Sequence, residues 1–498
     1  MSGLITDAFR LGWGALYWNL RKTIYVLRGH RQSCPCQIAS DSGRAYETGC
    51  EAVLGYRSPA RFRRLCPLLT TRSDGNWVCS VNSASVRPFW GRAAAFLGAS
   101  GLLLFTMLAV LGFGLLRVIG YDIHFRQVIW PPAWSEFPIV QAEFYQKRAQ
   151  AANARGRPAD SLLLLSTAYE LNPRNYAAGI QLAQLRQVTQ PALSDQTYAR
   201  LLADHPALRE DTAQAWFRAL LARGDFKTIQ RVAGERLLHS GTAPSPAWLQ
   251  AYLHATRQLG APAALDALLA EAELPAALIG PLKWERDLYR LDRASRLAAL
   301  ADATQRERDA FLCYHWSRYL LQEDGAAGLV ITALKRPDSP LGTREKVALQ
   351  LAALALTGQT IERTRLVTRL LEQPTQPAVC ELLSSHLTAY PDPELFSLYI
   401  EKLTREPLPP GEARYPQLLA LYAAAGSHRD AARLTIIADW ISVATGREYR
   451  LLPVIQASFM RPPAETRLDA ILPLLQPMPL ETSYALYSRF SPPPPFSP

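Results

Sequence analysis

Five of the seven cysteines of this 498-residue chain lie in its first 92 residues, and they are the side chains with the clearest potential for chemistry. The five are Cys34, Cys36, Cys50, Cys66 and Cys79. Thiolates bind zinc tetrahedrally, so four of them would complete a site, with His30 as a substitute for one. A typical zinc finger has two CxxC pairs, whereas this sequence has one CPC followed by widely separated single cysteines. We favour zinc, and reduced structural cysteines, disulfides or an iron–sulfur cluster are the alternatives.

The segment around these cysteines, residues 31–92, is rich in Gly, Ser, Asp, Pro and Arg and shows little hydrophobic periodicity. Such a segment builds little apolar core, and small domains of this kind usually need a covalent or metal staple. If the segment is cytoplasmic, a metal is favoured over disulfides. We therefore predict a basic, cysteine-containing domain with zinc as its cofactor.

Catalytic motifs are absent from the sequence. It contains no P-loop, HExxH, GxSxG or dinucleotide-binding glycine pattern, and its eight histidines are scattered singly. Cys313 and His315 are two residues apart, which places them on different faces of a helix. We expect Cys380 to be a buried apolar side chain and the neighbours Glu362 and Arg363 to lie on a solvated face. The chain is therefore predicted not to be an enzyme.

Charge is distributed unevenly along the chain. The formal net charge is +11, and residues 1–92 carry 13 Lys and Arg against 5 Asp and Glu. The remaining residues are nearly neutral. A basic segment of this kind can bind nucleic acid, but the hydrophobic stretch that follows it favours a role in membrane topology, so no nucleic-acid partner is expected.

Residues 93–116 form an uncharged stretch of 24 residues between Arg92 and Arg117. As a helix it would be about 36 Å long, enough for a bilayer core of about 30 Å. A buried core helix of this length would normally carry a polar residue, and a signal peptide would be shorter and closer to the N-terminus. We predict a transmembrane helix over residues 93–117.

The positive-inside bias predicts the orientation of this helix. Seven arginines lie between residues 57 and 92, whereas Arg117 and Arg126 are the only basic residues after the stretch until Lys147. We therefore expect a single-pass membrane protein with a cytoplasmic N-terminus and an extracytoplasmic C-terminal region. Composition and topology together favour a bacterial inner membrane.

Residues 1–30 predict an amphipathic helix, because apolar side chains recur every three or four residues. These are Ile5, Phe9, Trp13, Leu16, Leu20, Ile24 and Leu27. Interspersed arginines are typical of a helix on a membrane surface. Packing of the same helix against its own small domain is an equal alternative.

After a predicted juxtamembrane linker, residues 118–140, helical patterns alternate with short breaks over residues 141–487. Residues 155–175, RGRPADSLLLLSTAYELNPRN, resemble the second half of a tetratricopeptide repeat. The resemblance rests on a glycine at the turn between the helices, two small residues where the helices approach closely, and a proline after the second helix. These are Gly156, Ser161, Ala168 and Pro173.

Three weaker units continue the rhythm. In residues 215–237, Trp216 and Leu220 mark a first helix, Gly224, Asp225 and Phe226 a turn, and Ala233 a second helix. Residues 347–373 break at Gly358, and residues 418–441 are expected to turn at Gly426. The resemblance implies an α-solenoid with a protein partner bound on its concave face, and an all-α fold with a small irregular N-terminal domain.

The tail, residues 488–498, reads SRFSPPPPFSP. Four consecutive prolines favour polyproline II, which could serve as a ligand for an aromatic groove. We favour a tail without fixed structure.

Three functions are compatible with these features. The first is a membrane-anchored scaffold that presents a solenoid to a protein partner outside the cytoplasm. The second is a transmembrane sensor that couples ligand binding at the solenoid to the cysteine domain; the spacing of Ala94 and Gly98 favours helix pairing and a homo-oligomer. The third is an envelope enzyme acting on glycans through a site that sequence motifs do not reveal.

Overall fold

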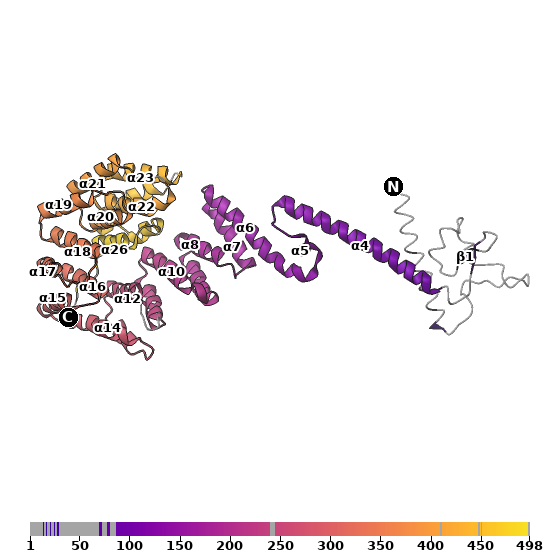
Figure 1. The fold of residues 1–498 in the computed structure, drawn as a ribbon, viewed down its shortest axis with the longest axis horizontal. Coiled ribbons are helices and arrows are strands. Elements are labelled where there is room, and N and C mark those ends of the chain that lie inside the picture. Colours follow the sequence, from indigo (N-terminus) through magenta and orange to yellow (C-terminus); the bar gives the residue numbers. More distant parts are fainter. Residues whose placement is uncertain are drawn as a thin grey trace, which may run out of the picture. The chain divides into compact units, whose positions relative to one another are not determined.

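The computed structural model describes residues 69–71, 77–79, 86–239, 245–408, 411–446, 449 and 451–496, together with six residues between Trp13 and Arg28. Side chains are described at those six positions and from Gly98 onward, apart from that of residue 412. The chain divides into two units, Met1–Phe144 and Tyr145–Pro498. The described part is predominantly helical, as the all-α prediction requires (Figure 1).

Among its described residues, the first unit contains one short antiparallel strand pair, β1 (Leu69–Thr71) and β2 (Trp77–Cys79), in which Leu69 lies opposite Cys79. Within the predicted N-terminal helix, five apolar residues are described, and all five are helical and between 43% and 80% exposed. They are Trp13, Leu16, Leu20, Ile24 and Leu27.

Helix α4 (Val86–Ile119) contains the predicted transmembrane segment and extends several residues beyond it at the N-terminal end. Its segment Gly98–Ile119 is 22 residues long and, by length and composition, apolar enough to cross a bilayer. Most of its large apolar side chains are exposed, among them Leu103 at 73% and Leu111 at 62%. This segment is therefore not the core helix of the unit that contains it.

Residues 118–140, predicted to be a linker, form short helices. They are α5 (Phe125–Ile129), η2 (Pro131–Glu136) and the start of α6 (Phe137–Ala154). Glu136 ties α5 to η2, since its carboxylate accepts hydrogen bonds from Arg126 Nη2 at 3.0 Å and Gln127 Nε2 at 3.1 Å. Trp134 Nε1 also donates to the Val128 carbonyl at 3.2 Å.

The second unit is a series of helices joined by short turns. The first half comprises α7 (Pro158–Leu171), α8 (Tyr176–Thr189), α9 (Pro191–Asp204), η3 (Pro206–Leu208), α10 (Arg209–Arg223), α11 (Phe226–Leu238), α12 (Pro246–Leu259), α13 (Ala263–Leu269), α14 (Ala276–Leu288) and α15 (Arg293–Arg306). The middle comprises α16 (Ala310–Gln322), α17 (Ala327–Leu334), α18 (Thr343–Leu356), α19 (Thr360–Leu370), α20 (Pro377–Ala389) and α21 (Pro393–Arg405). The last part comprises η4 (Glu412–Arg414), α22 (Tyr415–Ser427), α23 (Ala431–Thr445), α24 (Leu452–Phe459), η5 (Pro463–Glu465), α25 (Leu468–Ile471), η6 (Leu472–Leu474) and α26 (Leu480–Phe490).

These helices, α7 to α26, pack in a repeat-like manner, and we call them together the helical array. Helices that follow one another in sequence pack together, as α8 does with α9 and α11 with α12. Even-numbered helices also pack along the series, as α16 does with α18 and α20 with α22. The exception is α26, which leaves the series and packs against α10, α20 and α22 (Figure 1).

The residues that carry the resemblance to a tetratricopeptide repeat take the positions expected of them. Gly156 has a φ of +69° in the turn between α6 and α7, and Ser161 and Ala168 are 1% and 0% exposed. Pro173 follows the end of α7. The predicted turns at Gly224 and Gly358 are also confirmed, each with a φ of +68°.

The turn predicted at Gly426 is wrong. This glycine lies within the last turn of α22, and the left-handed residue before α23 is Arg429, with a φ of +55°. A β-carbon at position 426 would lie 2.5 Å from the Phe459 ring. Gly426 is therefore required by close packing between α22 and α24 and not by a turn.

Acidic or amide side chains define where many of these helices begin. Six N-cap side chains accept a hydrogen bond from a backbone N–H of the first turn: Asn175, Asp225, Asp292, Asp309, Asp392 and Asp430. Each such cap stabilises a helix by roughly 0.5–2 kcal/mol. The short turns between helices are thus specified locally.

We predict that Gly426→Ala destabilises the full chain by about 1–3 kcal/mol, because the added methyl group overpacks the Phe459 ring. Thermal or denaturant unfolding of the chain in detergent measures this change. The matched control is Gly328→Ala in α17, where a β-carbon meets no atom within 4 Å. The control is expected to be neutral or to stabilise by up to about 1 kcal/mol, and equal effects of the two substitutions would contradict the prediction.

Candidate functional site

Three even-numbered helices each place two polar or aromatic side chains three or four residues apart, so that both lie on one helix face. One pair lies on α12 and one on α16, and the third consists of Glu285 on α14 and its C-cap residue Tyr289. We call these six residues the polar cluster: His254, Arg257, Glu285, Tyr289, His315 and Tyr319.

Glu285 is at the centre of the polar cluster and is 0% exposed. The Tyr319 hydroxyl donates a hydrogen bond to its Oε1 at 2.9 Å, and His315 Nε2 lies 3.7 Å from its Oε2. Burial first, and the Glu285 charge second, raise the pKa of Tyr319 well above its ordinary value. The phenol therefore stays protonated and serves as the hydrogen-bond donor.

Arg257 is buried at 6% exposure beside the aromatic rings of the polar cluster. Its guanidinium carbon lies 5.9 Å from the centre of the Tyr289 ring and 5.5 Å from that of Tyr319. Burial lowers the pKa of Arg257, while the neighbouring Tyr319, Tyr289 and Glu285 oppose this shift.

Several atoms of the polar cluster have no hydrogen-bond partner of normal geometry among the described residues. They include Nε and Nη1 of Arg257, Oε2 of Glu285 and Nε2 of His315. Buried polar atoms in folded proteins are almost always paired, because an unpaired one loses its interaction with water without replacement. An incompletely satisfied cluster is therefore a candidate binding site.

The chain's own tail covers this cluster, contrary to the expectation that it lacks fixed structure. Phe496 is 7% exposed, and its ring centre lies 3.0 Å from the Arg257 guanidinium carbon and 4.7 Å from that of Arg296. The ring also contacts Tyr289 and Tyr319, with centroid distances of 4.9 Å and 5.8 Å. The tail is thus bound in an aromatic, cationic pocket.

A second buried arginine, Arg363 on α19, differs from Arg257 in that each of its three side-chain nitrogens has a hydrogen-bond partner. Its Nε donates to His386 Nε2 at 3.0 Å, its Nη1 to Asp392 at 3.0 Å and its Nη2 to the Tyr390 carbonyl at 2.8 Å. The prediction that Arg363 lies on a solvated face is wrong, since it is 7% exposed. A guanidinium with a partner at each of its three nitrogens joins the helices that supply those partners.

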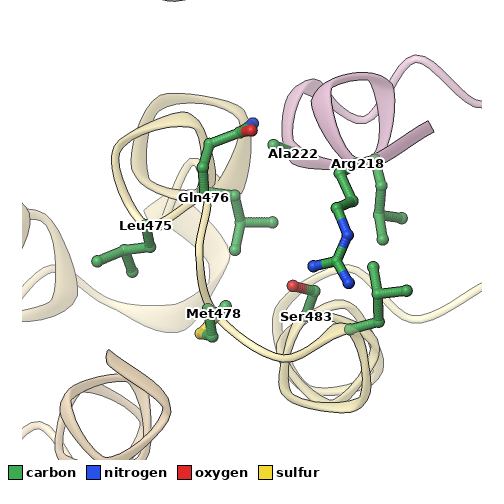
Figure 2. Close-up of a pocket in the computed structure, with 9 residues that line it drawn as sticks. Arg218, Ala222, Leu475, Gln476, Met478 and Ser483 are labelled. Carbon is green, nitrogen blue, oxygen red and sulfur yellow. The ribbon is translucent and has the colours of Figure 1, made fainter. Parts of the chain in front are cut away.

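A small cavity between α10 and the C-terminal segment offers no substrate site. Figure 2 shows Arg218 reaching from α10 toward Ser483, with Leu475, Gln476 and Met478 closing the other side. Its volume of about 10 Å³ is close to that needed for one water molecule.

The predicted metal site cannot be placed. Four of the predicted ligands, Cys34, Cys36, Cys50 and Cys66, lie outside the described residues, as does His30, and Cys79 is described only through the backbone of β2. The described residues contain no group of three or more His, Cys, Asp or Glu side chains that could hold a metal ion. Cys313 and Cys380 are both buried and form no disulfide, and burial was expected for Cys380.

Sequence reasoning missed the polar cluster and its occupant. The available signals were pairs of polar and aromatic residues with helical spacing, such as His315 and Tyr319, and a phenylalanine directly after four prolines. Neither signal shows that residues more than 170 positions apart meet. Comparison of the chain with known protein families, with curated proteins and with solved structures finds no match.

The buried His386 predicts a pH dependence of stability. Its Nε2 accepts a hydrogen bond from Arg363, and burial together with the Arg363 charge lowers its pKa from 6.5 to about 3. Between these values the unfolded chain binds more protons than the folded chain, so stability falls as the pH drops below about 6.5. At about pH 5 the loss from this histidine is roughly 2 kcal/mol.

His386→Gln retains an acceptor for Arg363 but cannot take up a proton in this range. Unfolding of the full chain at about pH 7 and about pH 5 should show a smaller loss of stability on acidification for the variant than for the unaltered chain. Identical pH dependence of the two proteins would show that His386 is not held neutral.

Proposed function

We propose that this protein is a membrane-anchored interaction scaffold: α4 crosses a bilayer, and the helical array holds a protein partner outside the cytoplasm. The observation that supports the anchor most directly is the exposed apolar surface of Gly98–Ile119. Water-soluble folds rarely leave so large a contiguous apolar surface uncovered. Lipid tails would cover it at no cost in unsatisfied backbone groups, because a helix pairs its own.

The segment after α4 is consistent with a membrane interface. Trp130 and Trp134 are 59% and 54% exposed, and indole rings favour the level of the lipid headgroups. The ion pair of Arg126 with Glu136 joins the two short helices, α5 and η2, that follow α4 in the sequence. These features support a short folded segment at the membrane interface, directly after the anchor.

Protein binding is supported by the character of the helical array. The array is nearly neutral, which disfavours nucleic acid as its partner. Its polar cluster combines arginine with tyrosine, residue types that dominate binding energy at protein interfaces. Arg257 and Tyr289 of this cluster also contact the Phe496 ring, which supports binding of an aromatic side chain at this part of the array.

Membrane insertion predicts that the full chain resists extraction at alkaline pH and that protease added from outside the cytoplasm digests the array. Replacing Leu108, near the middle of the apolar segment, by Arg should weaken insertion, because a central arginine costs about 2.5–3.5 kcal/mol on insertion scales. The control is Leu163→Arg in α7, a leucine that is 70% exposed on the array. Digestion of the array only from the cytoplasmic side would contradict the proposed orientation.

Zinc binding by the N-terminal cysteines is a separate part of the proposal. Elemental analysis of the full chain, purified under reducing conditions, should find about one zinc per chain. Replacing Cys34 and Cys36 by serine should remove it, whereas Cys313→Ser and Cys380→Ser in the helical array should not. Unchanged metal content in the first variant, or none in the unaltered chain, would exclude this site.

A further inference from the structure

We infer that the pocket around Arg257 is a peptide-binding site for a proline-rich segment with an aromatic anchor, and that the chain's own tail occupies it until a partner's segment of this chemistry displaces it. This inference rests on the proposed scaffold function, because it names the kind of partner. The pocket is formed by Arg257, Tyr289, Arg296 and Tyr319, and we call it the Phe496 pocket.

The tail consists of two parts that are held very differently. Helix α26 belongs to the core: the Tyr487 hydroxyl donates to the Leu221 carbonyl at 2.5 Å, and the Thr482 and Ser385 hydroxyls lie 2.9 Å apart. The Tyr484 ring packs on His254 at 4.6 Å. This helix therefore stays in place when the residues after it move.

Most of the described residues after α26, 491–496, are exposed. Pro492, Pro494 and Pro495 are exposed, and Phe496 is the one buried side chain among the described residues 491–496. Prolines lack an N–H group, so this segment donates almost no backbone hydrogen bonds to the array. A stiff polyproline segment that is held by an aromatic side chain can exchange with another peptide, because such a segment loses little entropy on binding.

The pocket recognises both features of the segment. The Arg257 guanidinium lies over the Phe496 ring, an arrangement in which a cation is attracted to the face of an aromatic ring. Beside it, Gly260 lets the proline strand pass closely: a β-carbon there would lie 3.2 Å from Pro494 Cγ. The site thus favours an aromatic side chain that is preceded by residues able to pass close to Gly260.

The fit of the tail is incomplete, which is why a partner's segment can replace it. With Phe496 in place, Arg257 Nε and Nη1 have no hydrogen-bond partner of normal geometry among the described residues, and the nearby Tyr289 hydroxyl pairs with the guanidinium only imperfectly. A ligand that adds a carbonyl or carboxylate acceptor beside its aromatic ring would pair these donors and bind more tightly. The tail, present at a high effective concentration, sets the affinity that such a ligand must exceed.

The test uses the full chain in detergent and a fluorescent peptide with the sequence SPPPPFSP, measured by fluorescence anisotropy. In the unaltered chain the tail competes with the peptide, whereas Phe496→Ala leaves the pocket open. We expect the peptide to bind the variant at least about tenfold more tightly than the unaltered chain, because apparent affinity scales with the fraction of open sites. A peptide with alanine in place of its phenylalanine should not bind.

Two substitutions in the Phe496→Ala chain separate the pocket from nonspecific attraction. Arg257→Gln should abolish peptide binding, while Arg306→Gln, which removes an arginine with an 81% exposed side chain, should leave it unchanged. If Phe496→Ala lowers the melting temperature, a chain ending at Ser491 replaces it, since that chain retains α26. Equal binding of the two peptides, or binding that persists without Arg257, would overturn the inference.

The peptide assay contains no partner protein, so its outcome is independent of the scaffold proposal; competition by added proteins is a second, separate measurement. If the peptide fails to bind, the Phe496 pocket is a purely structural contact, and the array can still hold a partner elsewhere. If the peptide binds but no protein with a proline-rich aromatic segment competes with it, the scaffold proposal fails at this face while the pocket remains established.

Discussion

The return of the C-terminal segment into the helical array is the contact on which the organisation of the array depends. A series of helical hairpins buries each member against its neighbours, which leaves one face of the even-numbered helices in need of cover. Helix α26 supplies that cover by packing on α10, α20 and α22. The hydrogen bond from Tyr487 to Leu221 joins residues 266 positions apart, so α26 connects distant parts of the array.

Two buried arginines show how the same side chain serves different purposes. Arg363 uses its three nitrogens to join α19 to the end of α20 and the start of α21, and its pairing with His386 and Asp392 offsets the cost of burying its charge. Arg257 lies among aromatic rings, the Tyr289 hydroxyl and a nearby carboxylate, and its Nε and Nη1 have no hydrogen-bond partner of normal geometry among the described residues. The two arginines differ in how many guanidinium nitrogens have hydrogen-bond partners and not in burial, because both side chains are less than a tenth exposed.

The first unit follows a different physical rule from the array. In the array, apolar side chains such as Leu220 and Ala233 are almost completely buried between helices. In Gly98–Ile119 most of the large apolar side chains are exposed, and the helix satisfies its own backbone. The two patterns fit two solvents, water around the array and lipid around α4, which is the basis for proposing an anchor joined to an interaction module.

Local sequence determined the helices, many of their ends and the apolar segment. Helix periodicity, N-cap residues such as Asp225 and turn glycines such as Gly224 act within a few positions, so they can be recognised without the fold. The positions of Ser161 and Ala168 came instead from the resemblance to a tetratricopeptide repeat, and both side chains are buried.

Only the tertiary structure decided which distant surfaces meet. Gly426 seemed to mark a turn, but its role comes from Phe459 on another helix; Arg363 seemed solvated, but His386 and Asp392 enclose it. The proline-rich tail seemed unstructured, yet Phe496 is buried against Arg257. Each of these outcomes depends on contacts between residues 23 or more positions apart, and hydrophobic periodicity carries no information about which distant residues will be neighbours.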